Sequence, residues 1–377
     1  MELVLEVFLL EIDNKIHLEL IHPSHAEEML ALVNKNRELF KEWLLWVNLV
    51  QTVEDEKKFI KRALERYANG ELVNCMIFYR GEMAGNVEIV LREGYGIKKG
   101  ELGYWLGAEF HGKGIMQKAT AKMIEIGFND YNLDKIMLKC AVRNERSCNV
   151  AQKIGMSHEG RQRGEIVVNG VVMDVDIYAI LKEEFFRAEV RKFYKPYYDK
   201  GDKAHTIEHA DDVCDLALRI NKKYDEKLVV LASYIHDMFN ATNRPIHNEL
   251  AYEYVLEIED RFIKELSQKE RLEVAHAVLE HRGCFTGAFY SPLSAIISSA
   301  DRGLPDLDVI VIRSMKFNHE NAEDVQRYVV GRYGTKGYVN YPDVYREIFK
   351  EELEAFRKLA DELTVERVLE IWEKEKK

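Results

Sequence analysis

The hydrophobic pattern divides the chain into two regions of different periodicity. In the first half, short runs of alternating or continuous apolar residues predict β-strands at residues 18–20, 74–79, 85–91, 103–106, 136–141 and 175–180. Apolar residues three and four positions apart predict helices between these strands, at residues 26–34, 54–67, 115–128 and 147–154. The apolar start of the chain, residues 1–13, is expected to form a further strand. This alternation is typical of a layered α/β domain.

The second half shows helical spacing only. It predicts helices at residues 183–198, 209–222, 228–238, 249–256, 270–280 and 293–301, followed to residue 377 by amphipathic helices with a charged end, expected to serve packing or oligomerisation. With only 6 Pro and 22 Gly, the chain has little material for a flexible linker. The sequence therefore predicts an α+β chain of two domains, residues 1–184 with a mixed sheet and residues 187–377 all helical.

Composition and charge narrow the class of protein. Of 377 residues, 47% are hydrophobic and 32% are charged, which is typical of a globular chain with a real core and excludes disorder and collagen-like repeats. The net charge of -11 argues against a nucleic-acid partner, because binding to phosphate backbones needs a basic excess. Five cysteines without CxxC spacing argue against a disulfide framework and fit a reducing cytoplasm. The N-terminus starts with acid and is too short to span a bilayer, so no membrane association is expected.

A glycine loop in the first half carries the first chemical signal. Gly112 and Gly114 follow the strand predicted at 103–106 and precede the helix predicted at 115–128. Glycines let the loop turn its N–H groups toward one point, and the positive end of the helix dipole adds to the field there. A pyrophosphate cradle and a simple tight turn are both compatible with Gly-x-Gly alone.

The surrounding motifs give the loop a context. Gly-Tyr-Trp-Leu precedes it, and Asn-Glu-Arg-Ser (144–147), Ile-Gly-Met-Ser-His-Glu-Gly (154–160) and Asp-Val-Asp-Ile-Tyr (174–178) follow. Together these motifs resemble the GCN5-related N-acetyltransferases (GNAT), most closely the RimJ/RimL-type branch, over about residues 8–182. The resemblance implies that acetyl-CoA is the cosubstrate, that the strand near 104–107 splays to seat its pantetheine arm, and that the pyrophosphate lies on residues His111, Gly112, Lys113, Gly114, Ile115 and Met116.

The same resemblance implies the catalytic residues. Glu165, expected just before the penultimate strand, would be the general base, directly or through water; Ser147 would protonate the leaving thiolate, and Asn144 would bind the pantetheine arm. From the residues alone, Ser147 also suits a helix N-cap, which is compatible with its catalytic role, whereas Glu165 is equally suited to be a surface carboxylate. Glu109 departs from the Gln or Arg that the family prefers at that position, and it puts a carboxylate near the expected pyrophosphate.

The acceptor is defined only as a primary amine. Phe40, Trp43 and Trp46 lie at helical spacing, which is more typical of core residues than of a substrate wall. A protein N-terminus, a polyamine and a small amino compound all stay open.

Histidines and aspartates organise the second half. His205 and His209 lie one helical turn apart, and His236-Asp237 ends an apolar run. Burying adjacent histidine and aspartate side chains is costly unless something such as a divalent metal compensates them. His281 and Asp301 end later helices, and these groups can converge on one ion or, alternatively, be satisfied separately inside a helical bundle.

The order of these residues resembles the HD superfamily of metal-dependent phosphohydrolases, over about residues 187–310. The resemblance implies that a divalent ion (Mn, Mg, Fe or similar) is held by His209, His236, Asp237 and Asp301, with Asp237 also orienting the attacking water. It further implies a second metal or phosphate contact at His247, His281 and Arg302. His205 is expected to support the site or face solvent, and His276 to be structural.

The resulting hypothesis is a bifunctional enzyme. An acetyl-CoA-dependent N-acetyltransferase is joined to a metal phosphohydrolase that acts on a nucleotide or another small phosphoester. Two alternatives stay open. In one, a domain binds acetyl-CoA or a nucleotide without turnover and regulates the other, which Glu109 favours; in the other, both folds serve only as a scaffold.

Overall fold

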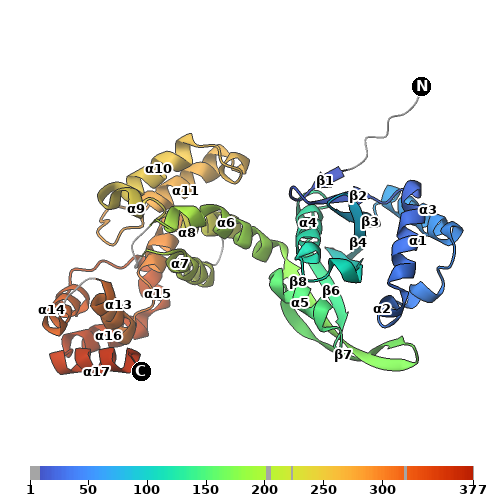
Figure 1. Ribbon diagram of the computed structural model, residues 1–377. Coiled ribbons are helices and arrows are strands. Elements are labelled where there is room, and N and C mark those ends of the chain that lie inside the picture. The colour runs from blue at the N-terminus through green and yellow to red at the C-terminus, as the bar shows by residue number, and fades with distance from the viewer. Residues whose placement is uncertain (1–8, 201–204, 222–223, 318–320, 377) are drawn as a thin grey trace. The chain divides into compact units, whose positions relative to one another are not determined.

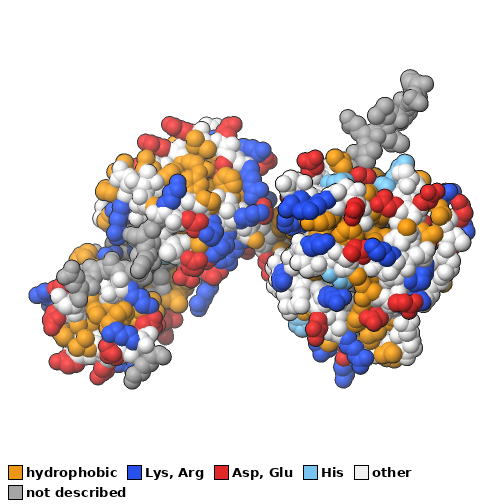
Figure 2. All heavy atoms as spheres, in the orientation of Figure 1, with side chains coloured by type: hydrophobic (Ala, Val, Ile, Leu, Met, Phe, Trp, Pro, Cys, Tyr) orange, Lys and Arg blue, Asp and Glu red, His pale blue; other side chains and the backbone are white. Residues whose placement is uncertain are grey.

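The computed structural model describes residues 9–200, 205–221, 224–317 and 321–376 (Figure 1). The chain divides into two compact units, Met1–Phe185 and Phe186–Lys377. The predicted domains, residues 1–184 and 187–377, would each fold independently, and these limits stay a prediction. On the face drawn in Figure 2, basic and acidic side chains are mixed over each unit.

An eight-stranded mixed sheet forms the first unit, in the order β1-β2-β3-β4-β5-β6-β8-β7. All neighbouring strands are antiparallel except β5 and β6, which are parallel. The strands are β1 (Leu9–Glu11), β2 (Ile16–Leu20), β3 (Leu72–Tyr79), β4 (Glu82–Gly94), β5 (Ile97–Leu106), β6 (Lys135–Ala141), β7 (Ser157–Val168) and β8 (Val171–Leu181). This architecture confirms the predicted mixed-sheet α/β fold. Of the strand expected at residues 1–13, only β1 falls within the described residues.

Helices cover both faces of this sheet, with α1 and α3 on one side and α4 on the other (Figure 1). One hydrophobic core joins these helices to the strands. Thr52 and Asp55 form a capping box that starts α3, because each side chain accepts from the other's backbone N–H. The helical elements are η1 (Pro23–His25), α1 (Ala26–Lys35), α2 (Arg37–Lys41), η2 (Leu45–Asn48), α3 (Val53–Ala68), η3 (Ala108–Phe110), α4 (Ile115–Asn129) and α5 (Glu145–Lys153).

Two local expectations were wrong. The aromatic residues Phe40, Trp43 and Trp46 do not share a helix, because α2 ends at Lys41 and a separate 3-10 turn, η2, follows after the extended residue Leu44. Strand β7 was not expected at all. It is almost wholly exposed and polar, so it has no hydrophobic alternation, and its pairing with β8 makes it a strand. Glu165 consequently lies within the penultimate strand and not before it.

In its described residues, the second unit contains helices and no strands, which confirms the predicted helical region. Its elements are α6 (Lys182–Tyr198), which begins in the first unit, α7 (Ile207–Ile220), α8 (Glu226–Ile235), α9 (Asn240–Asn243), η4 (Arg244–Ile246), α10 (His247–Glu257), η5 (Ile263–Glu265), α11 (Gln268–Glu280), α12 (Pro292–Asp301), α13 (Leu307–Phe317), α14 (Ala322–Tyr333), α15 (Asp343–Ile348), α16 (Lys350–Asp361) and α17 (Val365–Glu375). The end of the helix predicted at 209–222 lies outside the described residues.

A central apolar helix organises this unit. All residues of α8 from Leu228 to Ile235 are buried, and α7, α11 and α12 pack against it. A second, smaller core joins α13, α14, α16 and α17 through residues such as Val325 and Ile371. Among the described helices of the chain, none combines the length and the apolar character needed to cross a membrane.

Candidate functional sites

The glycine loop forms the start of α4. Gly112 has φ of 75° and Gly114 has φ of 71°, and Gly114 is the N-cap of the helix. Residues with a Cβ rarely adopt this left-handed conformation, so glycine is required at both positions. The loop leaves the first N–H groups of a 15-residue helix without helical partners, which is the arrangement that binds phosphate groups.

Neighbouring side chains of this loop turn toward the protein. The His111 ring donates from Nε2 to the Leu106 carbonyl at 3.1 Å, and its Nδ1 accepts from Arg146 at 3.4 Å. The Lys113 ammonium donates to the Glu109 carbonyl at 2.8 Å and lies over the Phe110 ring. The backbone of the loop is thus the part that is presented to a ligand.

The strands β5 and β6 separate beside this loop. Their parallel pairing ends at Leu102 and Leu138, although β5 continues to Leu106 and β6 to Ala141. Unpaired backbone groups on the inner edges of two diverging strands are available to an extended ligand. This is the splay expected around residues 104–107.

A cavity of about 480 Å³ occupies the splay and the glycine loop. Its wall contains five of the six loop residues predicted to hold the pyrophosphate (His111, Gly112, Gly114, Ile115 and Met116), as well as Asn144 and Ser147, Phe40 and Trp43, and the cations Arg146 and Lys153. Among the described residues, no Asp or Glu lines this wall. Lys113 and Trp46 are not part of the wall. Phe40 is also buried core, whereas Trp43 packs only partly, so the expectation that these aromatic residues are core and not wall was incomplete.

The cavity wall also carries a pair of hydroxyl groups. The Tyr104 hydroxyl lies 3.0 Å from Ser147 Oγ and 3.2 Å from the Ser147 carbonyl. Burial raises the pKa of Tyr104, so its hydroxyl keeps its proton at neutral pH. Ser147 is not the helix cap: α5 begins at Glu145, and the Asn144 side chain caps it by accepting from the Ser147 N–H at 3.2 Å. The hydroxyl of Ser147 is therefore not used for capping.

The two carboxylates named from the sequence lie elsewhere. Glu165 is on the exposed strand β7, outside the cavity wall, and its carboxylate lies 3.7 Å from the Lys139 ammonium. Glu109 faces α1, where it pairs with Lys35 at 2.5 Å and accepts from Asn36 at 3.3 Å. Although partial burial acts in the opposite direction, these partners hold the pKa of Glu109 below its ordinary value. The charge of Glu109 is thus compensated locally.

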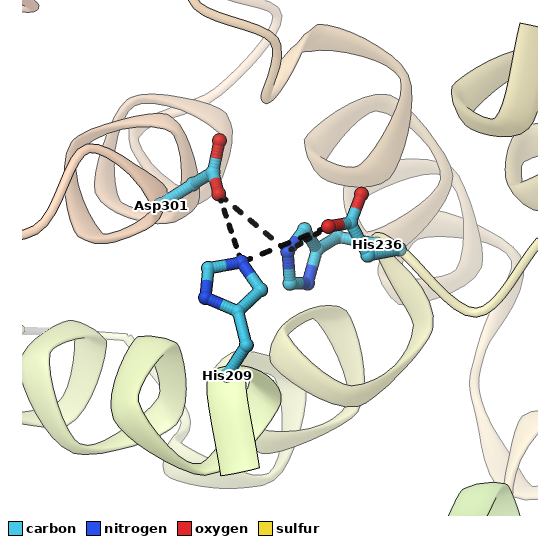
Figure 3. A group of neighbouring side chains, drawn as sticks. His209, His236 and Asp301 are labelled. Atoms are coloured by element: carbon cyan, nitrogen blue, oxygen red, sulfur yellow. Dashed lines mark ion pairs between the residues drawn. The ribbon is translucent and has the colours of Figure 1, made fainter. Parts of the chain in front are cut away.

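In the second unit, four predicted metal ligands converge from three helices. His209 comes from α7, His236 follows α8, and Asp301 ends α12 (Figure 3), with Asp237 next to His236 in the chain. The His209 Nε2 atom lies 3.2 Å from Asp301 Oδ1 and 3.6 Å from Asp237 Oδ2. One ligand atom from each of the four residues lies within 4.8 Å of the others. This compactness is what a single ion requires.

A second group shares Asp237 with the first. His247 Nε2 lies 3.0 Å and His281 Nε2 3.5 Å from Asp237 Oδ1, and the two Nε2 atoms lie 3.1 Å apart. The Oδ2 atom of the same carboxylate lies 3.6 Å from His236 Nε2. Asp237 therefore turns one oxygen toward each group, as a carboxylate that bridges two ions would.

The backbone fixes the protonation of three of these rings. Each Nδ1 of His236, His247 and His281 lies 2.7 Å from a backbone carbonyl, of Ser233, Arg244 and Val278 respectively. A carbonyl only accepts, so each Nδ1 carries a proton, and in the neutral ring Nε2 has a lone pair that can bind a metal. Although burial acts the other way, the Asp237 carboxylate raises the pKa of His281, so an ion would displace a proton from that ring on binding.

Burial leaves some of these lone pairs without partners. His236 and His281 are buried, and the buried Nε2 atoms of His209 and His236 make no hydrogen bond to any residue that the structure describes. Burial lowers the pKa of His236 to about 4, which keeps the ring neutral at physiological pH. Although burial acts the other way, nearby histidines, His236 foremost, hold the pKa of Asp237 well below its ordinary value. Neutral imidazoles and ionised carboxylates are the forms that bind a divalent metal, so these residues fit one.

The remaining residues named from the sequence lie around this centre. His205 stacks edge-on against His209, with ring centroids 6.1 Å apart, and His276 donates to Glu280 and stacks on Tyr290. The Arg302 guanidinium donates to the carbonyls of Asn340 and Ser298 and to the Ser298 hydroxyl, so it faces the C-terminal helices. His205 and His276 are in neither ligand group.

Sequence reasoning missed several residues that shape the two sites. Arg146 and Lys153 line the cavity, and only Arg146 belongs to one of the motifs named from the sequence, Asn-Glu-Arg-Ser (144–147). The carbonyls of Ser233, Arg244 and Val278 carry no signal in the sequence, because any residue supplies a carbonyl.

Comparison with known proteins assigns the first unit. The acetyltransferase (GNAT) domain description matches residues 15–157. The N-acetyltransferase YnaD of Bacillus subtilis (strain 168), itself uncharacterized, is 30% identical over 136 residues, which cover 36% of this chain and 78% of YnaD. The chain belongs to the GNAT acetyltransferases.

This chain matches two further GNAT relatives over nearly their whole length. The ribosomal-protein-serine acetyltransferase of Escherichia coli (strain K12) is 27% identical over 170 residues, covering 45% of this chain and 94% of the relative. The crystal structure of the microcin C7 self-immunity acetyltransferase MccE, in complex with acetyl-CoA and AMP, is 30% identical and covers 45% of this chain and 94% of MccE, with a TM-score of 0.43. In the second unit, residues 204–311 match the HD domain. The chain thus joins a GNAT acetyltransferase domain to an HD domain.

Proposed function

We propose that the first unit transfers the acetyl group of acetyl-CoA to a primary amine. The observation that carries this proposal is the combination, in one cavity, of the glycine loop, the separated strands β5 and β6, and the Tyr104–Ser147 hydroxyl pair. The loop residues 111–116 and Asn144 would hold the pyrophosphate and the pantetheine arm. Arg146 and Lys153 add positive charge to the wall of a site for a polyanionic cosubstrate.

In the proposed reaction the amine nitrogen attacks the acetyl carbonyl carbon and the carbon–sulfur bond breaks. Ser147 would give its proton to the departing thiolate and regain one from water, and the Tyr104 hydroxyl, which stays protonated, would hold Ser147 Oγ in position through their 3.0 Å contact. Glu165 would accept the proton of the attacking ammonium. Because Glu165 lies outside the cavity wall, that proton would pass through water.

The wall of the cavity favours one class of acceptor. Phe40, Trp43 and Leu44 are apolar, and among the described residues of the wall there is no carboxylate to recognise the additional ammonium groups of a polyamine. An α-amine on an apolar or neutral residue, such as a protein N-terminus, suits this wall better. This acceptor class agrees with the RimJ/RimL-type branch proposed for the unit.

Thiol release from acetyl-CoA with a panel of N-terminal peptides and polyamines tests the first activity. Ser147→Ala should lower kcat while the stabilisation of the protein by acetyl-CoA persists, and Glu165→Gln should do the same. Exposed Glu159→Gln on the same strand is the matched control. Turnover of polyamines but not of peptides would contradict the acceptor class, and unchanged kcat in Glu165→Gln would remove Glu165 from the mechanism.

For the second unit we propose a divalent-metal phosphohydrolase that acts on a nucleotide or another small phosphoester. His209, His236, Asp237 and Asp301 would hold one ion, and Asp237, His247 and His281 a second. A divalent ion supplies hydroxide near neutral pH by lowering the pKa of bound water. Asp237, with its charged oxygens turned to both groups, would orient the nucleophile.

Metal analysis and a hydrolysis panel of nucleotides and sugar phosphates test this second activity. His236→Ala should lose both bound metal and hydrolysis, whereas His276→Ala, at a histidine outside both ligand groups, should keep them. Purified protein without stoichiometric metal after incubation with Mn²⁺, or hydrolysis that survives in His236→Ala, would contradict the proposal. Regulation without turnover is not proposed, because its supporting feature, the Glu109 charge, is compensated by Lys35.

A further inference from the structure

Three arginines lie near the two groups of candidate metal ligands, at and beyond the C-terminal end of the segment that matches the HD domain. Arg302 follows Asp301, Arg332 lies near the end of α14, and Arg357 is on α16. Two of them, at positions 332 and 357, lie beyond the segment that matches the HD domain. They gather around residues 339–341: Arg357 lies 5.3 Å from the Tyr341 ring centroid, Arg302 donates to the Asn340 carbonyl at 2.8 Å, and the Arg332 carbonyl accepts from the Val339 N–H at 3.0 Å.

These guanidinium groups lack anionic partners. Among the described residues, none of the three forms an ion pair with a carboxylate, and the Nε atoms of Arg332 and Arg357 are buried without any hydrogen bond. Arg332 donates from Nη1 to the Tyr328 hydroxyl at 2.7 Å and lies over the rings of Tyr328 and Tyr333. Aromatic faces compensate a desolvated cation only in part, so the cluster keeps an excess of positive charge.

The cluster is connected to the metal groups through short contacts. Arg302 donates to Ser298 Oγ at 2.7 Å, and this hydroxyl donates to the His281 carbonyl at 2.9 Å. Gly283, two residues after His281, lies against Arg332: a Cβ built on this glycine would be 3.3 Å from Arg332 Nη2. Through Ser298 and Gly283, the arginines are thus linked to the backbone at and just after His281, so an anion that they held would lie on the His281 side of the candidate metal ligands.

We infer that Arg302, Arg332 and Arg357 form a binding site for a second phosphate group of the substrate. Guanidinium groups bind phosphate oxygens through paired N–H donors, and the two unused Nε donors provide such capacity. The substrate class would be a small phosphoester with a further phosphate, a bisphosphate or a diphosphate. This assignment rests on the phosphohydrolase function proposed for the unit, and the anion site itself does not.

Binding of inorganic pyrophosphate to the full-length chain tests the site without metal or turnover. The protein is treated with chelator, and saturating CoA blocks the pyrophosphate cradle of the first unit. Calorimetric titration should show binding to the wild type and at least roughly tenfold weaker binding to Arg332→Gln and Arg357→Gln. The pyrophosphate affinity of Arg332→Lys, which keeps the charge, should lie between those of the wild type and Arg332→Gln. The control is Arg346→Gln, an exposed arginine of α15 that pairs with Asp343.

Equal pyrophosphate affinity in the wild type and in folded Arg332→Gln and Arg357→Gln, with unchanged melting temperatures, would overturn the site. In the Mn²⁺-loaded protein, the same variants should raise KM for a nucleoside bisphosphate and leave KM for the matching monophosphate unchanged. Equal effects on both substrates would overturn the assignment of the site to a second phosphate. Pyrophosphate binding that needs these arginines, in a chain that hydrolyses no phosphoester, would support the anion site while refuting the phosphohydrolase function.

Discussion

Removing divalent ions should destabilise the HD unit by an amount that the structure bounds. Without an ion, the buried Nε2 atoms of His209 and His236 make no hydrogen bond to any described residue, although His209 Nε2 lies 3.2 Å from Asp301 Oδ1. Leaving a buried polar group unsatisfied costs about 1–3 kcal/mol. Two such groups cost about 2–6 kcal/mol, which an ion bound to both atoms would remove.

This free energy corresponds to a measurable shift in melting temperature. For a unit of the size of Phe186–Lys377, each kcal/mol shifts the melting temperature by about 2–4 °C. We therefore expect the chelator-treated protein to melt roughly 4–24 °C below the protein reloaded with excess Mn²⁺, with any metal binding to the unfolded chain reducing the difference.

Calorimetry of the full-length chain measures this shift. The transition of the GNAT unit is identified by its response to acetyl-CoA, and it should not respond to Mn²⁺. His276→Ala should keep the full Mn²⁺ response, and His236→Ala should abolish it. Coincident melting curves of chelator-treated and Mn²⁺-reloaded wild-type protein would refute the reasoning, because the Nε2 atoms of His209 and His236 would then not be metal ligands.

Three further predictions concern the GNAT unit. In a thiol-release assay, Ser147→Ala should lower kcat about 10²-fold or more and leave KM for acetyl-CoA nearly unchanged, because the substitution removes the proton donor to the thiolate. An unchanged kcat would exclude this role of Ser147. Gly114→Ala should cost about 1–2 kcal/mol at a left-handed position and raise KM for acetyl-CoA, measured by melting and steady-state kinetics; an unaltered KM would mean that the loop does not contact the cosubstrate. Burial raises the pKa of Glu56 from 4.5 to about 7, so its protonated form stabilises the fold fully below pH 4.5 and this stabilisation is lost as the pH rises through 7. In denaturant titrations, the free energy of unfolding of Glu56→Gln should therefore exceed that of the wild type by up to about 3 kcal/mol at pH 8 and by nothing at pH 4. The same difference at both pH values, or any pH-dependent gain in the exposed control Glu54→Gln, would contradict the raised pKa of Glu56.

The two architectures were predictable because their signals are local. The helices of the second unit have apolar residues at helical spacing, and the buried run of α8 ends directly at His236 and Asp237. The glycine loop was also legible, since only glycine adopts its left-handed conformations without strain. Strand β7 was not predictable, because its residues are polar and exposed and only the neighbouring β8 holds it in the sheet.

By itself, the sequence determined the fold class, the glycine loop, and which residue types could bind acetyl-CoA and metal. Tertiary structure alone decided how those side chains are used. It paired the Ser147 hydroxyl with Tyr104 and left the cap of α5 to Asn144, and it turned one oxygen of Asp237 to each of two histidine groups. It also set the proton on Nδ1 of three rings and brought Arg332 against Gly283. The physical reason is that spacing along the chain fixes which face of an element a residue occupies, whereas hydrogen-bond direction, burial and charge depend on partners tens of residues away.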